Sequence, residues 1–257
     1  MHSCEYINHL KHEKKQPTFT IVTVSFNCKT TIEKTILSVL QQDFTDYEYI
    51  VIDGGSTDGT TDIIRKYESR LAYWCSESDK GIYDGMNKGV KEASGEWIVF
   101  MNAGDVMHSS KTLNTVYKYA QTSSQDILYG DILTERNGTL CLKKALEPCN
   151  KQRMFFCHQS GYTRTQILRE HPFDLRFKLS ADFYFFKYCY QKGYHFTHIP
   201  EPLTIYDRNG VSNTHRLVGL YDNVRVIKLL DIVFEKFKLL TKLYFVIFWN
   251  KLIKKLR

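Results

Sequence analysis

The sequence lacks a long run of apolar residues. The stretch LYFVIFW at 243–249 has only seven residues, whereas a transmembrane helix needs about 20. The first 17 residues are polar and contain no apolar segment of the kind that a secretory signal carries. We therefore expect a cytoplasmic protein that does not span a membrane.

Paired cysteines and phosphate-binding glycine motifs are also missing. The seven cysteines are scattered, without a C-x-x-C pair, which favours reduced thiols over disulfides or a zinc site. The glycine motifs G-x-x-x-x-G-K-S/T and G-x-G-x-x-G, which cradle phosphate in nucleotide-binding proteins, are absent. The phosphates of a ligand must therefore be neutralised in another way.

The body of the chain has no excess of basic residues. The formal net charge is +7, and residues 225–257 hold nine Lys and Arg against two acidic residues. The excess therefore lies entirely in this tail, and residues 1–224 are neutral. A nucleic-acid-binding protein is expected to carry its basic patch on the folded domain, so we exclude nucleic acid as a partner.

The chain does contain a regular alternation of apolar β-branched runs and amphipathic helical runs. The runs that predict strands are 19–26, 47–53, 71–77 and 96–101. The runs that predict helices are 30–42, a segment through Ile63, Ile64 and Tyr67, and 83–93. This alternation predicts an α/β fold in which helices cover both faces of a parallel sheet.

The chain after Asp105 is less regular and more aromatic. We expect a helix at 110–121, a strand at 126–130, a hairpin around Asn137 and Gly138, and a helix at 181–191. We therefore divide the chain into a polar N-terminal segment at 1–17, a nucleotide-binding half at 18–105, an acceptor-binding half at 106–210, and a tail at 211–257.

Polar side chains gather where the predicted strands end. They are Thr23 and Ser25 in the first strand, Asp53 at the end of the second, Asp79 after the third, and Asn102 and Asp105 after the fourth. Each residue alone is a common helix cap or turn residue. Because ligands of open parallel sheets bind beyond the carboxyl ends of the strands, four such ends together favour a binding site.

Two of these carboxylates suggest particular ligands. Asp53 precedes two glycines that let a ligand approach the backbone, and a carboxylate there can accept a hydrogen bond from a nucleobase or a ribose hydroxyl. Asp105 offers hard oxygen atoms, which suit Mg²⁺ or Mn²⁺ shared with substrate phosphates. A metal there would offset charge on a leaving diphosphate.

The motifs TIVTVSFN, IDGGSTDGT, SDKGIYDGMNKG, ASGEWIVFMNAGD and SADFYFF occur in this order. Over residues 19–210 the chain thereby resembles the family-2 glycosyltransferases of the GT-A fold, especially bacterial enzymes that assemble surface polysaccharides. The resemblance implies a nucleotide-sugar donor, UDP- or GDP-linked, and a saccharide or polyprenyl-diphosphate-linked acceptor. It also implies a place on the cytoplasmic face of the inner membrane.

The resemblance also implies roles for individual residues. The nucleoside would be held by Thr23, Ser25 and Asp53, and the donor pocket would be lined by Asp79, Asp84, Asn87 and Asn102. Asp105 would be the last acid of the DxD-type metal motif, and Asp182 would be the base. In the sequence NAGD, Gly104 stands where the family often has another acid, which implies weak and replaceable metal binding. His158 would face the diphosphate or metal, or else satisfy a hydrogen bond in the core.

The implied mechanism is a single displacement with inversion. Asp182 would remove the proton of the acceptor hydroxyl as it attacks the anomeric carbon, and one base suffices because no glycosyl-enzyme intermediate forms. Two alternatives remain: a sugar-phosphate nucleotidyltransferase and a non-catalytic, membrane-bound nucleotide-sugar binder. The first should carry a glycine-rich basic loop after its first strand, and SFNCKTT is not one.

The tail has the pattern of an amphipathic helix. Its charged residues at 225, 228, 231, 235, 238 and 242 recur at steps of three and four, which predicts one charged stripe between apolar faces. Such a helix suits adsorption to an anionic membrane surface. The alternative is a helix that packs against the body of the protein or against a second subunit.

Overall fold

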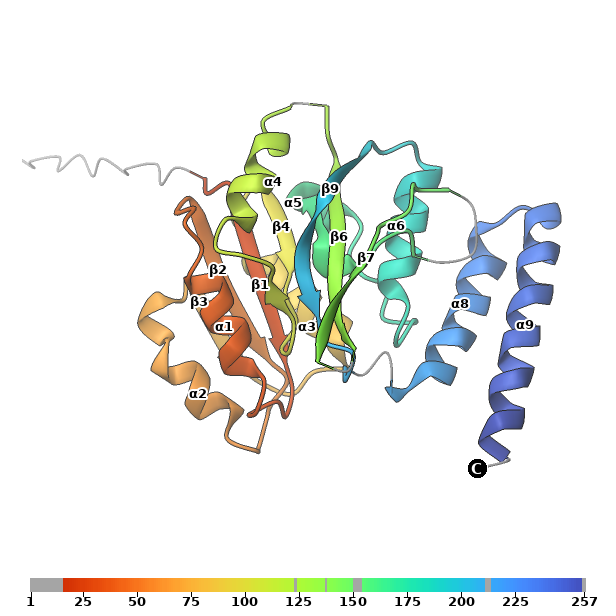
Figure 1. The fold of residues 1–257 in the computed structure, drawn as a ribbon, viewed down its shortest axis with the longest axis horizontal. Helices are drawn as coiled ribbons and strands as arrows, with labels where there is room; N and C mark the ends of the chain where they lie inside the picture. The colour runs from red at the N-terminus through yellow and green to blue at the C-terminus, as the bar shows by residue number, and fades with distance from the viewer. Residues whose placement is uncertain (1–15, 123, 137, 150–153, 211–213, 256–257) are drawn as a thin grey trace, which may run out of the picture.

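The computed structural model describes residues 16–122, 124–136, 138–149, 154–210 and 214–255, which form a mixed sheet with helices on both faces (Figure 1). The strands are β1 (Phe19–Ser25), β2 (Tyr47–Asp53), β3 (Tyr73–Ser76), β4 (Trp97–Phe100), β5 (Val106–Met107), β6 (Ile127–Arg136), β7 (Thr139–Lys143), β8 (Gly161–Arg164) and β9 (Phe196–Tyr206). The helices are α1 (Ile32–Leu40), α2 (Thr60–Lys66), α3 (Ile82–Glu92), α4 (Thr112–Ala120), α5 (Thr165–Glu170), α6 (Ala181–Gln191), α8 (Arg216–Leu230) and α9 (Val233–Lys255), with short 3-10 turns at Glu68–Arg70 and His158–Ser160.

The first half of the sheet is parallel, as predicted. The strand order is β3-β2-β1-β4, and β1 pairs in parallel with both β2 and β4. All seven residues of β1 are buried, because a central strand with helices on both faces meets no solvent. The carboxyl ends of these four strands therefore meet at one edge of the sheet.

The second half of the sheet is mixed, in keeping with the less regular pattern of the chain after Asp105. β8 lies antiparallel between β4 and β6, β9 pairs in parallel with β6, and β5 pairs antiparallel with β9. An antiparallel neighbour needs no helical crossover, so the strict strand-helix alternation ends after β4. The predicted hairpin is present as β6 and β7, and Gly138 has the positive φ of a tight turn; Asn137 lies outside the described residues.

Alternate residues of the strands fill two cores, one on each face of the sheet. Val22 and Ile50 face α3, α5, α6 and the C-terminal helices. Ile21 and Val51 face α1, α2 and α4. Figure 1 shows these two helical layers on opposite sides of the central strands.

The tail forms two helices, so the predicted single stripe from 225 to 242 is wrong. α8 ends at Asp231, whose backbone is extended, and α9 then packs back along α8 (Figure 1). Leu220 and Ile227 of α8 and Leu243 of α9 belong to the same buried cluster as α6. The tail is therefore docked on the body. Of the described residues, none lie in a helix that is both long and apolar enough to cross a membrane.

A buried ion pair joins α6 to the turn between α8 and α9. The Nζ of Lys187 lies 2.8 Å from Oδ2 of Asp231, and both side chains are almost fully buried. The two atoms are not aligned as a hydrogen bond, so the contact is mainly electrostatic. Each charge depends on the other because desolvation of an unpaired ion is costly.

We expect Lys187→Met to lower the free energy of unfolding by about 3–5 kcal/mol, because it leaves Asp231 as a buried, unpaired charge. The double change Lys187→Met with Asp231→Leu should recover most of this loss. Urea unfolding followed by circular dichroism measures both. Asp62→Asn, which breaks the exposed pair with Arg65, is the control and should cost less than about 1 kcal/mol. A loss of similar size in Lys187→Met and the control contradicts the assignment.

Candidate active site

Two cavities adjoin beyond the carboxyl ends of the first strands. The strand-end cavity, lined among others by Ser25, Gly54, Asp79, Asn102 and Asp105, has a volume of about 520 Å³. The α6 cavity lies beside Asp182 at the start of α6, and its volume is about 360 Å³. Both volumes fall within the usual range of small-molecule sites. The wall residues that the two cavities share are His158, Gln159, Leu179 and Tyr206.

Asp53 orders the wall of the strand-end cavity. Its fully buried carboxylate accepts hydrogen bonds from the hydroxyls of Ser25, Ser56 and Ser76 at 2.6–2.8 Å. Burial alone would raise the pKa of Asp53, but the bonds from Ser56, Ser76 and Ser25 outweigh it and lower the pKa. Asp53 does not itself line the cavity. It holds the turn after β2, and Ser25 and Gly54 form the surface that a nucleoside would meet.

Three of the predicted donor-site residues have structural roles and line neither cavity. Thr23 lies two residues before the end of β1 and is fully buried in the core, where its hydroxyl bonds to that of Tyr49 at 2.8 Å. Asn87 donates to the carbonyl of Phe173 and accepts from its N–H, at 2.8 and 2.9 Å. Asp84 accepts from the backbone of Lys80 in the first turn of α3. Each of these side chains is thus already bonded within the protein.

Asp79 does line the strand-end cavity. Its Oδ1 accepts the N–H of Gly81 at 2.8 Å, which fixes the loop before α3. A Cβ atom on Gly54 would come within 2.7 Å of Oδ2 of Asp79. Glycine at 54 is therefore required for the close approach of the two loops.

Asp105 is a buried carboxylate with a second carboxylate beside it. Its Oδ1 accepts the N–H of Asp207, just after β9, at 2.7 Å. Burial raises the pKa of Asp105 to about 7, and the neighbouring charge of Asp207 adds to the increase. Gly104 has a φ of +107°, and a Cβ there would lie 2.6 Å from Oδ2 of Asp207. The carboxylate of Asp207 thus takes the space of the acid that is missing from NAGD.

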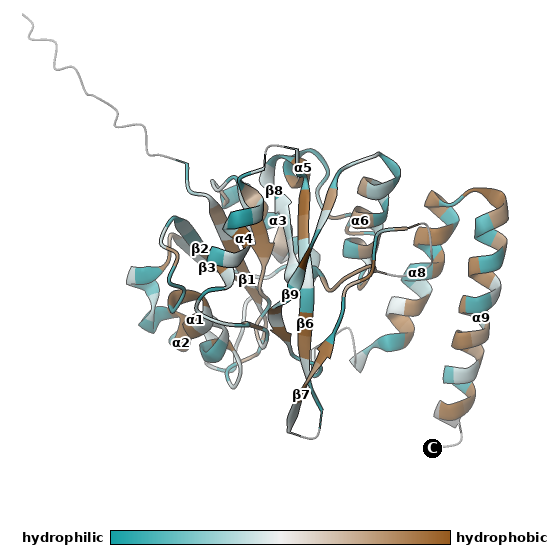
Figure 2. Ribbon diagram, turned by 45° about the horizontal axis from the view of Figure 1, so that its top comes forward, coloured by the Kyte–Doolittle hydropathy of each residue, from teal (hydrophilic) through white to brown (hydrophobic). Residues whose placement is uncertain are grey.

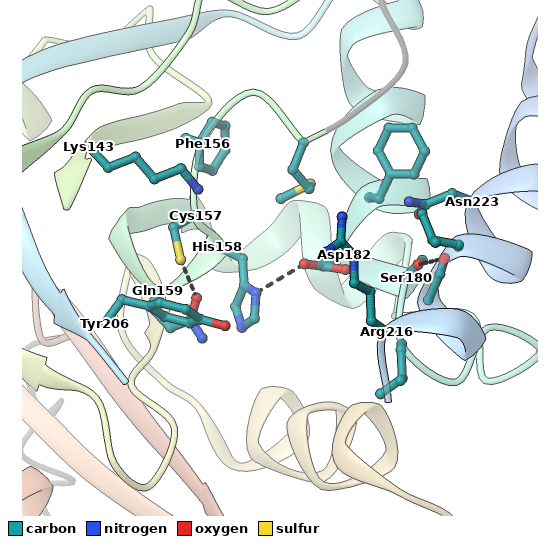
Figure 3. A pocket seen from close by; sticks show the side chains of 15 residues that line it. Lys143, Phe156, Cys157, His158, Gln159, Ser180, Asp182, Tyr206, Arg216 and Asn223 are labelled. Atoms are coloured by element: carbon teal, nitrogen blue, oxygen red, sulfur yellow. Dashed lines mark hydrogen bonds and ion pairs between the residues drawn. The ribbon is translucent and has the colours of Figure 1, made fainter. Parts of the chain in front are cut away.

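Asp182 is held by two hydrogen bonds in the first turn of α6. Oδ1 accepts the hydroxyl of Tyr83 at 2.7 Å, and Oδ2 lies 3.0 Å from Nδ1 of His158 (Figure 3). Burial alone would raise the pKa of Asp182, but the hydrogen bond and charge of His158, together with Tyr83, lower it. The carboxylate is therefore ionised at neutral pH and can accept a proton.

The ionised state of Asp182 fixes the orientation of the groups next to it. A hydrogen bond to a carboxylate requires a proton on Nδ1 of His158, and Nε2 of the same ring lies 3.2 Å from the amide nitrogen of Asn102. The amide oxygen of Asn102 then faces the other way, and it is buried without a partner among the described residues. The chain Asp182–His158–Asn102 therefore links the two cavities, and His158 is not a core residue.

The oxygens of Asp105, Asp207 and Asn102 suit Mg²⁺ or Mn²⁺, which prefer hard ligands. The described residues contain no group of three or more His, Cys, Asp or Glu side chains that would hold a metal on their own. The residues therefore fit a cation that takes its remaining ligands from a substrate. Asp207 was not predicted from the sequence, although it follows a strand as the other polar residues do.

A model of the family described as glycosyl transferase family 2 matches residues 20–190. The chain belongs to the family-2 glycosyltransferases. A similar curated relative is the PGL/p-HBAD biosynthesis glycosyltransferase of Mycobacterium bovis, which is 29% identical over 184 residues, covering 68% of this chain and 70% of the relative. The protein is thus a glycosyltransferase, and the nucleotidyltransferase alternative has no support.

Solved structures of glycosyltransferases share this mixed α/β fold. TarS of S. aureus in complex with UDP superposes with a TM-score of 0.66 at 19% identity, covering 84% of this chain and 67% of TarS. A mannosyltransferase of Pyrobaculum calidifontis in complex with GDP-Man and Mn²⁺ superposes with a TM-score of 0.64 at 17% identity, covering 84% and 64%. The fold is therefore the predicted GT-A fold.

We expect Asn87→Ala to lower the free energy of unfolding by about 1–3 kcal/mol, because it leaves two backbone groups of Phe173 without a partner. Nucleotide binding should not change. Urea unfolding and a thermal-shift titration with UDP measure the two effects. Asn114→Ala on α4 is the matched control, since that side chain makes no hydrogen bond among the described residues. Loss of UDP binding without loss of stability contradicts the structural role.

Proposed function

We propose that the protein transfers a sugar from a UDP- or GDP-linked donor to an acceptor hydroxyl, with inversion, during assembly of a bacterial surface polysaccharide. The observation that carries this proposal is the link between Asp105 in the strand-end cavity and Asp182 in the α6 cavity. His158 lies on both cavities and joins them. A donor and an acceptor bound on either side would meet at that point.

The donor occupies the strand-end cavity in this proposal. Its nucleoside lies against Ser25, Gly54 and Asp79, and its diphosphate points toward Asp105 and Asp207. Mg²⁺ or Mn²⁺ bound there would offset the charge that develops on the leaving diphosphate. The complexes of related folds with UDP, and with GDP-Man and Mn²⁺, support a nucleotide-sugar donor and a divalent metal.

Asp182 acts as the general base on the acceptor. It is ionised, it lines the α6 cavity, and Tyr83 and His158 hold its two oxygens in place. It is also the single carboxylate among the residues that line this cavity. A mechanism with retention needs a second group as nucleophile, so one carboxylate favours a single displacement with inversion.

We expect Asp182→Asn to reduce sugar transfer by about 10²–10⁴-fold, because a positioned general base is lost. The amide preserves the shape of the side chain, so binding of UDP or GDP should remain. Release of nucleoside diphosphate measures turnover, and a thermal-shift titration with and without Mn²⁺ measures binding, since a ligand of the folded state raises its stability. The control is Asp43→Asn, at an exposed aspartate outside both cavities.

Two results would contradict the proposed function. The first is that neither UDP nor GDP moves the melting curve of the wild-type protein, with or without Mn²⁺. The second is that Asp182→Asn turns over as fast as the control. Binding of nucleotide without any turnover in the wild type, with every acceptor tested, would favour the alternative of a non-catalytic nucleotide-sugar binder.

We also propose that α9 adsorbs to the cytoplasmic face of the inner membrane. Leu239, Leu243 and Ile247 of α9 are buried against α8 and the body, whereas the opposite face is apolar and exposed (Figure 2). The exposed apolar residues are Val233, Phe234, Phe237, Phe245, Phe248 and Trp249. Exposed lysines flank this face, and an anionic bilayer accommodates both groups. Such a location suits a polyprenyl-diphosphate-linked acceptor.

We expect the double change Phe237→Glu and Phe248→Glu to lower binding to anionic vesicles by at least about tenfold, because it removes two aromatic side chains from the lipid contact and adds repulsion. Co-sedimentation with vesicles that contain phosphatidylglycerol measures this. The matched control is Leu140→Glu on β7, also an exposed apolar position. If the wild type stays in the supernatant and forms a dimer that the double change disrupts, the face binds a second subunit instead.

A further inference from the structure

Two cationic side chains from separate elements reach into the α6 cavity. Lys143 ends β7 and Arg216 begins α8, and both line the cavity beside Asp182 (Figure 3). Neither has an acidic partner within 4 Å among the described residues, although ion pairs are common elsewhere in the chain. Asn223 also lines the cavity, and its amide makes no side-chain hydrogen bond among the described residues. Three polar groups that have no such partner in the described part of the chain thus share one space.

The charge of Asp182 does not explain these cations. Its carboxylate is already balanced by the hydrogen bonds of His158 and Tyr83. Arg216 extends toward Asp182 in Figure 3 but lies beyond ion-pair distance. A neutral sugar would gain little from two full charges. An anion, by contrast, is bound well by an arginine fork together with the point charge of a lysine.

α8 presents this surface through a regular spacing. Arg216, Gly219, Leu220 and Asn223 all line the cavity, and steps of three and four residues place them on one face of the helix. The first of these residues lies in the first turn, where the partial positive charge of the helix adds to that of Arg216. α8 lies outside residues 20–190, which the family model matches. This wall is therefore a feature of the chain beyond the matched region.

We propose that the acceptor carries a phosphate ester, which Arg216 and Lys143 bind while the reacting hydroxyl lies at Asp182. The proposal rests on the proposed function, since it names the class of acceptor for the same site. Recognition of the phosphate makes Arg216 and Lys143 specificity-determining residues. The phosphate comes either from the headgroup of a lipid-linked saccharide or from a soluble sugar phosphate.

The diphosphate of the donor is the competing anion, and the geometry places it elsewhere. Asp105 and Asp207 mark its position in the strand-end cavity, which Lys143 and Arg216 do not line. Arg216 does border a third cavity, which Asp207 and Arg136 also line. Binding must therefore be measured with the donor site filled, and Arg136 provides a control for general positive charge.

The test is a calorimetric titration of the full chain, saturated with UDP and Mn²⁺, with two anionic probes and their neutral counterparts. The probes are farnesyl diphosphate against farnesol, and glucose 1-phosphate against methyl glucoside. We expect at least one anionic probe to bind about tenfold tighter than its counterpart, the difference of a charge-assisted hydrogen bond. Arg216→Gln and Lys143→Gln should each weaken it by about tenfold, and Arg136→Gln by less than about twofold.

The variant Asp182→Asn tests whether the anion binds within the α6 cavity. Removing a neighbouring negative charge should tighten binding of the anionic probe by a few-fold and leave the neutral one unchanged. Farnesyl diphosphate alone as the tight probe indicates a lipid headgroup, whereas glucose 1-phosphate alone indicates a soluble sugar phosphate. Tight binding of both shows that the phosphate suffices.

The proposal is overturned if no anionic probe binds better than its neutral counterpart. It is also overturned if the double change Arg216→Gln with Lys143→Gln binds the probes as the wild type does. The UDP-dependent shift in melting temperature, recorded on the same samples, reports the proposed function separately. An intact UDP shift without anion binding removes the phosphate-bearing acceptor alone, and anion binding without a UDP shift removes the donor assignment alone.

Discussion

The hydrogen bond between Asp182 and His158 is the contact on which the arrangement of the site depends. Asp182 begins α6, whereas His158 stands in the 3-10 turn that leads into β8. β8 lies antiparallel between β4 and β6, and this placement sets His158 beside Asn102, which follows β4. An all-parallel sheet would have put a crossover helix before this strand. The irregular half of the sheet therefore brings Asp182, the proposed base, close to the strand ends.

The same irregular half of the sheet accounts for the single acid of the sequence NAGD at 102–105. NAGD has one acid where the family often has more, and the space beside Gly104 is filled by the carboxylate of Asp207. Asp207 arrives at that point because β9 runs parallel to β6 and ends next to β5. A side chain at 104 and Asp207 exclude each other sterically. The carboxylate that the motif lacks at position 104 is thus supplied from Asp207, which lies far from the motif in the sequence.

The sequence predicted the parallel half of the fold because each of its strands and helices follows a simple period. Its motifs also pointed to Asp105 and Asp182 as residues of one site; the two line adjoining cavities that share His158, and their roles stay predictions. It did not show that Thr23 and Asn87 bond to Tyr49 and Phe173 and line neither cavity, since a motif does not tell whether a side chain already has a partner in the protein. Asp207 and Arg216 were not predicted, because both lie after the last of the motifs on which the site prediction rests, although their neighbours Tyr206 and Gly219 also line the cavities.

The tail packs directly against the elements that form the α6 cavity. One face of α8 lines the cavity through Arg216 and Asn223, and another packs into the core that also holds α6. The buried pair of Lys187 and Asp231 fixes the end of α8 to α6, the helix that carries Asp182. α9 packs along α8 and leaves its apolar face outward. A surface that holds α9 would therefore also set the orientation of the cavity, because no flexible linker intervenes between them among the described residues from 214 to 255.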